Sequence, residues 1–130
     1  ASPRLAAAWL NRGTALQETG DFDGAMIDYQ KALKINQDSA IARSSLMKIF
    51  RNLGRTNEAD EQEALARKLM KKENEYNQAC FEALCGNTEK ALVLLRIGLE
   101  KKQVTKAWAH KDTDLENLHA DARFKGLVGE

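Results

Sequence analysis

Residues 9–33 read WLNRGTALQETGDFDGAMIDYQKAL, and this stretch decides the fold. Apolar or small residues recur there at steps of three and four, the spacing that places side chains on one face of an α-helix. Between the two halves, Gly20 suits the left-handed position that ends a helix, and Asp21 suits the position that caps the next one. Gly13 and Ala25 are small enough for two helix backbones to approach closely. The stretch therefore predicts a pair of antiparallel helices joined by a tight turn.

The same pattern recurs along the chain. Gly20 is followed 34 residues later by Gly54, which is followed 32 residues later by Gly86, and three alanines keep the same register: Ala25, Ala59 and Ala91. A helix pair of this length cannot bury its apolar face alone, so consecutive pairs are expected to stack. The repeat predicts an all-α solenoid of three antiparallel helix hairpins, with helices near residues 5–19, 22–35, 39–53, 56–71, 73–85 and 88–102.

Turn residues agree with these boundaries. Asp38 and Thr88 are expected to cap the N-termini of the third and sixth helices, because both side chains accept hydrogen bonds from orphan backbone N–H groups. Gly54 and Gly86 are expected to end the third and fifth helices, since glycine tolerates a left-handed backbone.

The residues after the third hairpin have the features of a C-terminal cap. Asp112 and Asp121 each suit the N-cap of a short helical turn, and Val104 and Trp108 are candidate anchors in the polar stretch before them. The last repeat of a solenoid needs a cover for its open apolar face. We expect that cover to consist of Leu115, Leu118, Phe124, Leu127 and Val128.

Length and composition fit one compact α-rich domain. The chain has 130 residues, of which 43% are hydrophobic, with a single proline and a net charge of +1. That charge supplies no general field for nucleic acid or for an anionic membrane surface. No apolar run approaches the roughly 18 residues that a membrane-spanning helix requires. We expect a soluble intracellular protein, in the cytoplasm or an organelle lumen. Because Ala1 is not a methionine, we expect a fragment of a longer protein, with any targeting segment outside it.

Two local clusters favour structural roles. The basic run at residues 67–72 suits the C-terminus of a helix, where cations complement the macrodipole, and no aromatic platform lies beside it for nucleic acid. Cys80 and Cys85, five residues apart on one helix, are badly placed to bridge to each other and lack a metal-binding spacing. We expect two reduced, half-buried thiols.

Catalytic groups do not converge in the sequence pattern. His110 and His119 are nine residues apart and share no helical face, which favours surface or cap histidines. Asp112, Asp114 and Glu116 lack the spacing of an EF-hand loop, which favours helix capping over a cation site. No glycine-rich phosphate loop and no serine elbow is present. We therefore expect no enzyme activity, no cofactor and no metal site.

The first hairpin resembles the tetratricopeptide repeat, a helix-pair motif of 34 residues. The resemblance rests on a set of spaced apolar and small residues: Trp9, Gly13, Leu16, Gly20, Ala25, Tyr29 and Ala32. Three positions depart from the family pattern. Arg12 replaces a leucine, Leu16 an aromatic residue and Gln37 a proline. The second copy is degenerate, with Arg43 at the tryptophan position and Glu63 at the aromatic one.

The third copy is similar to a last-repeat variant that opens with Tyr76 and Asn77, and Gly98 replaces its second alanine. The tail is similar to the Asp-Pro-Asp-Leu and Asp-Pro-Arg-Phe endings that follow many such arrays, with Thr113 and Ala122 in place of the prolines. The resemblance implies a right-handed superhelical solenoid as a single domain over residues 1–130. Its expected parts are repeats at 6–39, 40–71 and 72–103, and a C-terminal cap at 104–130.

The family resemblance also implies a binding surface. In that family the first helix of each hairpin lines a concave groove that holds a helix or an extended segment of a partner protein. Carried onto this sequence, the candidate protein-binding residues are Leu10, Asn11, Thr14, Lys48, Arg51, Asn52, Tyr76, Asn77 and Cys80. An asparagine amide both donates and accepts hydrogen bonds, so Asn11 and Asn77 suit a partner's main chain, although a plain surface asparagine explains them equally well. Lys48 and Arg51 suit an acidic group.

Some family members grip the C-terminal carboxylate of large heat-shock chaperones through lysine, arginine and asparagine. The carboxylate-binding residues of those members are absent here. The corresponding positions hold Leu10, Thr14, Ser45, Glu73 and Asn77. We therefore expect no chaperone-tail adaptor, but a non-catalytic adaptor or scaffold for another protein partner, and nucleic acid is not favoured. Two alternatives stay open. The chain could self-associate through its uncapped first repeat, near Leu5 and Trp9, or it could regulate a larger enzyme.

Overall fold

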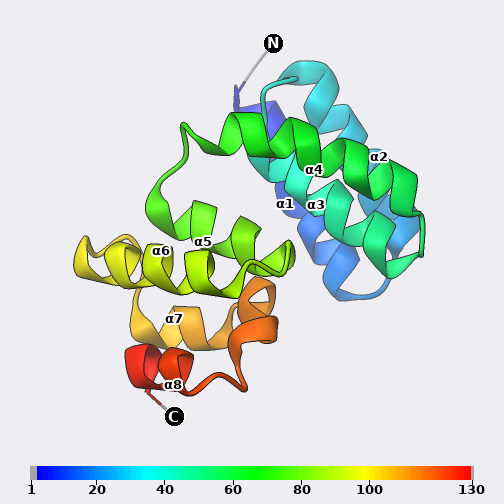
Figure 1. Ribbon diagram of the computed structural model, residues 1–130. Coiled ribbons are helices and arrows are strands. Elements are labelled where there is room, and N and C mark those ends of the chain that lie inside the picture. The colour runs from blue at the N-terminus through cyan, green and yellow to red at the C-terminus, as the bar shows by residue number, and fades with distance from the viewer. Residues whose placement is uncertain (1–2, 130) are drawn as a thin grey trace. The chain divides into compact units, whose positions relative to one another are not determined.

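The computed structural model describes residues 3–129, and all the regular structure in that part of the chain is helical (Figure 1). The chain divides into two compact units, the first ending at Leu69 and the second beginning at Met70. The first unit contains α1 (Pro3–Glu18), α2 (Phe22–Ile35), α3 (Ala40–Asn52) and nearly all of α4 (Thr56–Met70). The second contains α5 (Glu75–Leu84), α6 (Thr88–Glu100), α7 (Lys106–Lys111), the 3₁₀ helix η1 (Thr113–Leu118) and α8 (Ala122–Val128).

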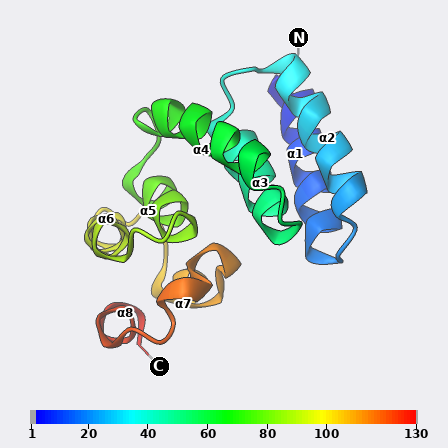
Figure 2. The ribbon, with the colours of Figure 1, turned by 45° about the vertical axis from the view of Figure 1, so that its right-hand side comes forward.

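The first two helices form the predicted antiparallel hairpin, and Figure 2 shows them side by side. Gly20 has the left-handed φ of 87°, and the Asp21 carboxylate accepts a hydrogen bond of 3.0 Å from the Gly24 N–H. The two helices pack tightly at Gly13, where an added Cβ would lie 2.7 Å from Cε1 of Tyr29. The glycine therefore makes room for an aromatic ring from the facing helix.

Two of the predicted N-caps are wrong, each by one residue. At α3 the cap is Ser39, whose Oγ accepts from the Ala42 N–H at 3.1 Å, because Asp38 is still in the preceding turn and donates its N–H to Asn36. At α6 Thr88 is already the first helical residue, since Gly86 (φ 82°) makes the turn very short.

The residue before α6 makes no capping hydrogen bond with its side chain. Instead, Nδ2 of Asn87 donates to Oε1 of Glu82 at 2.8 Å. Glu82 is a buried residue, only 4% exposed, and the Lys90 ammonium also lies 3.3 Å from its carboxylate. The Asn87 side chain therefore stabilises the buried Glu82 carboxylate instead of capping α6.

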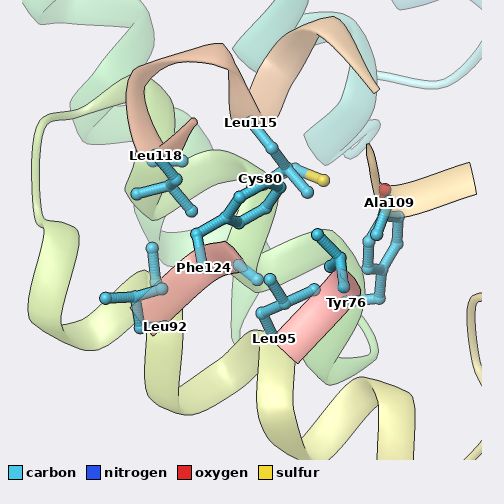
Figure 3. Packing of buried hydrophobic residues seen from close by; sticks show 12 residues of the cluster. Tyr76, Cys80, Leu92, Leu95, Ala109, Leu115, Leu118 and Phe124 are labelled. Carbon is cyan, nitrogen blue, oxygen red and sulfur yellow. The ribbon is translucent and has the colours of Figure 1, made fainter. Parts of the chain in front are cut away.

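The C-terminal cap packs on the third hairpin as predicted (Figure 3). Leu115 and Leu118 are fully buried, Phe124 is 2% exposed, and the three side chains gather over Leu92 and Leu95 of α6. Val128 is also buried in this cluster, and Leu127 packs against it. Asp112 and Asp121 cap η1 and α8, as expected from their positions.

One predicted anchor of the cap is wrong. The polar stretch before Asp112 contains α7, where Ala109 is fully buried while Trp108 is 60% exposed. A helix of six residues turns only one face to the core, and that face belongs to Ala109. Val104 does pack against the core, in agreement with its predicted role.

The first unit has a separate core, formed mainly by alanines and aromatic residues where α1, α2, α3 and α4 meet. Ala25, Ala42 and Ala59 have no exposed surface, and Tyr29 is 1% exposed. No helix in residues 3–129 has the length and apolar character to cross a membrane. Both cysteines are free, Cys80 buried and Cys85 half-buried.

Candidate functional site

The candidate groove residues fall into two groups, because α1 and α3 belong to the first unit and α5 to the second. On α1, Asn11 and Thr14 are exposed, and Leu10 is half-buried against the core. The Thr14 hydroxyl donates to the Leu10 carbonyl oxygen at 3.0 Å, so its proton is already used within the helix. Asn11 therefore offers the polar amide on this part of the surface.

On α3, Arg51 is already paired within the hairpin. Its Nη2 lies 2.7 Å from Oε1 of Glu63 and 3.1 Å from Oδ1 of Asp60, both on α4. The hydrogen bond to Glu63 is the main reason why the pKa of Arg51 is raised. A partner's acidic group would share this guanidinium with two resident carboxylates. Lys48 is half-buried and Asn52 is exposed.

On α5, two of the candidates are covered by the C-terminal cap. Tyr76 is 7% exposed and Cys80 is 8% exposed, and both belong to the core cluster of the second unit (Figure 3). Neither side chain offers surface to a partner here. Asn77 is half-buried, and its Nδ2 donates to Oε1 of Glu73 at 3.0 Å.

Tyr76 and Cys80 instead converge on Asp112. The Tyr76 hydroxyl and the Cys80 thiol both donate to Oδ2 of Asp112, the thiol at 3.7 Å, while Oδ1 accepts from the Asp114 N–H at 3.0 Å. Burial, followed by the charge of Asp112, raises the pKa of the Cys80 thiol, and burial together with the hydrogen bond to Asp112 raises the pKa of the Tyr76 phenol. Both groups are therefore kept protonated as donors, and one carboxylate connects α5 to the cap.

The same cluster contains residue types that can bind a metal ion. Ligand atoms of Cys80, Asp112 and Asp114 lie within 4.8 Å of one another. Metal binding would require the thiolate, yet the surroundings favour the neutral thiol, and Oδ2 of Asp112 already accepts two hydrogen bonds. These observations fit a structural link better than a metal site.

The start of α5 and the end of α6 are connected by a second polar network. Glu75 accepts hydrogen bonds from Gln103 Nε2 at 2.6 Å and from Lys101 Nζ at 2.9 Å. The hydrogen bond to Gln103, and then the one to Lys101, lowers the pKa of Glu75 to about 2. Gln103 Oε1 also accepts from the Tyr76 N–H at 3.0 Å.

The two histidines, which share no helical face, are brought together by the folded cap. The His110 and His119 rings are stacked with centroids 5.8 Å apart, and the His119 ring stacks in turn on Phe124 at 5.1 Å. The prediction of cap histidines is compatible with this position, but the sequence pattern did not indicate their contact. It depends on the turn between η1 and α8, which a helical period does not describe.

The comparison with protein families concerns the first hairpin, where Gly13 receives the Tyr29 ring and Gly20 turns the chain. The family model described as tetratricopeptide repeat matches residues 6–39. This stretch thus has the sequence pattern of a tetratricopeptide repeat (TPR). This TPR spans most of α1, all of α2 and the turn that leads to Ser39. The helix pairs α3/α4 and α5/α6 continue the same helical repeat architecture. No curated protein matches the chain.

The departures from the TPR pattern have local explanations. Nε of Arg12 lies 3.2 Å from Oδ2 of Asp28, a carboxylate in a residue that is only 2% exposed, so the cation partners a buried acid on the facing helix. Arg43 contacts Gln62 Oε1 at 3.3 Å and the Gln37 carbonyl oxygen at 3.4 Å. Each arginine thus replaces an apolar contact of the TPR with a polar contact between neighbouring segments.

Proposed function

We propose that the chain is a protein-binding module that holds a helix or an extended segment of a partner across α1 and α3 of the first unit. The TPR at residues 6–39 supports a protein-protein interaction module in general, and the family is generally non-catalytic. The proposed binding mode rests on exposed polar side chains of α1 and α3, the first helices of their hairpins. These side chains are Asn11 on α1 and Arg51 and Asn52 on α3.

The partner segment has a defined chemistry under this proposal. Asn11 and Asn52 supply amides that suit main-chain peptide groups. Arg51, which Glu63 and Asp60 already partner, favours a hydrogen-bond acceptor over a strongly acidic helix. Tyr76 and Cys80 are left out of the proposed contact surface because the cap covers them.

The test begins with peptides selected from a display library on the immobilised chain, whose dissociation constants are then measured by calorimetry. Asn11→Ala and Arg51→Gln should each weaken binding roughly tenfold, as expected for residues at the centre of a contact. Gln30→Ala and Lys34→Gln on α2 are matched controls, because both side chains are exposed outside the proposed surface. Equal affinities for the groove and control variants would contradict the proposal.

Self-association is a second candidate, favoured by one observation. Leu5 on α1 is a large apolar side chain that is 49% exposed. A second copy of the chain could cover it, and sedimentation of Leu5→Ser beside the unmodified chain tests this. A mass that stays monomeric across a wide concentration range would exclude the idea.

A further inference from the structure

A hollow in the C-terminal cap is outside the proposed protein-binding surface. It has a volume of about 390 Å³ and is lined by His110, His119, Phe124, Lys125 and Gly129. Ligand pockets in proteins span roughly 300–1,000 Å³, so the hollow is large enough for a small molecule. All its lining residues come from the second unit.

The hollow combines flat rings with basic groups. The His110, His119 and Phe124 rings form a continuous stack, with interplanar angles of 24° and 25° between neighbours. Lys125 adds an ammonium group, and no carboxylate of residues 3–129 lines the hollow. The nearby Asp121 carboxylate is 2.8 Å from Arg123, which also pairs with Glu89. Among the described residues, the lining therefore carries the positive charge of Lys125, and the nearby Asp121 carboxylate is paired with Arg123.

One polar atom of the stack has no partner. Nε2 of His119 is buried and forms no hydrogen bond within the described residues. This imidazole nitrogen therefore keeps an unused hydrogen-bonding capacity within the cap. His119 also lines the hollow, so its imidazole is a candidate hydrogen-bond donor to a ligand there.

We propose that this hollow binds a small aromatic anion, with the ligand ring on the aromatic stack and its oxyanion on Lys125 and a histidine. Aromatic rings favour offset stacking, and charge-assisted hydrogen bonds to an oxyanion are the strongest of their kind. The oxyanion is a phosphate or a carboxylate, two groups that present the same kind of acceptor. The site is independent of the protein-binding surface on α1 and α3.

The experiment is an NMR titration of the histidine ring signals of the full chain with phenyl phosphate and, in parallel, with benzoate. Saturable shifts of the His110 and His119 signals are expected, and the ligand with the higher affinity identifies the oxyanion. Lys125→Gln should weaken binding about tenfold, because the ammonium is lost. Lys111→Gln is the matched control: this exposed lysine of α7 does not line the hollow, and its loss should leave affinity unchanged.

Inorganic phosphate tests the aromatic part of the proposal without disturbing the core residue Phe124. It should bind about tenfold more weakly than phenyl phosphate, since it has no ring to stack. Absence of saturable shifts with both aromatic ligands overturns the proposal, as do equal losses in Lys125→Gln and Lys111→Gln. Equal affinity for inorganic phosphate overturns its aromatic specificity. None of these results bears on peptide binding by the first unit, so the two proposals fail separately.

Discussion

The hairpins α1/α2 and α5/α6 solve the same packing problem in different ways. Each has a glycine where a side chain would meet the facing helix, Gly13 in the first and Gly98 in the second. At Gly13 the facing group is the ring of Tyr29, whereas at Gly98 it is the backbone and Cβ of Tyr76, with the nearest atom 3.2 Å from an added Cβ. The first tyrosine therefore fills its own hairpin, while the second directs its ring out of its hairpin towards the cap.

The hydroxyl groups of the two tyrosines show what this difference means. Tyr29 donates to Oε1 of Gln17 on the adjacent helix at 2.8 Å, a contact within one repeat. Tyr76 donates to Asp112, 36 residues away, in the segment that closes the array. The first hairpin thus satisfies its tyrosine hydroxyl locally, whereas the third uses it to hold the segment that covers it.

The largest expected effect is a loss of stability in the second unit alone, caused by a substitution in its C-terminal cap. Phe124→Ala should destabilise the second unit by about 3–5 kcal/mol, because a buried aromatic side chain is lost. The first unit should keep its stability, since its core is a separate cluster. Denaturant unfolding can follow both, because Trp9 lies in the first unit and Trp108 in the second. Each tryptophan is read in a variant in which the other is replaced by phenylalanine. A loss shared equally by both signals would contradict the separation.

The second prediction compares the loss of the tyrosine hydroxyl group in the two hairpins. Tyr76→Phe should cost about 1–3 kcal/mol, because part of the Asp112 carboxylate then lacks a donor in a half-buried site. Tyr29→Phe should cost less, about 0.5–1.5 kcal/mol, since water can replace the hydroxyl near its partly exposed partner Gln17. Thermal unfolding of the two variants gives the comparison directly. A larger loss for Tyr29→Phe would show that the link to the cap contributes less than the geometry indicates.

The smallest effect is a difference in acid stability. The pKa of Glu75 falls from 4.5 to about 2 on folding, so its stabilising contribution is complete above pH 4.5 and is lost as the pH falls towards 2. Glu75→Gln should therefore flatten the acid limb of the second unit's stability profile, measured by Trp108 fluorescence. Glu100→Gln is the matched control, because it keeps the hydrogen bonds of Glu75. If both variants lose stability with the same pH profile, the network at Glu75 is not responsible.

The sequence predicted the hairpins because their determinants are local. Gly20, Gly54 and Gly86 all have left-handed backbones where the repeat placed them, and the buried alanines keep the expected register. The true N-caps, Ser39 and Asn87, are each one residue from the predicted Asp38 and Thr88, because the sequence pattern does not fix how many residues a tight turn takes.

The site was harder to predict than the fold. A helical period identifies the face to which a side chain belongs, but not which distant segment covers that face. Tyr76 and Cys80 are at groove positions by register, yet the cap buries them. Likewise, the pairing of Arg51 with Glu63 and the stack of His110 on His119 arise from segments that meet only after folding. The roles of the remaining groove residues stay predictions.

The side chain of Gln103 has a consequence for the order of folding. The first turn of α2 is capped by its own neighbour Asp21, so that helix can begin with contacts available at once along the chain. The first turn of α5 has a local cap too, Asn74, but its Tyr76 N–H donates to Gln103 from 27 residues away. Helix initiation is the costly step of helix formation, and here a residue beyond the end of α6 completes it. We therefore infer that α5 becomes fully formed only when α6 has returned alongside it, so that this hairpin closes as a single cooperative event.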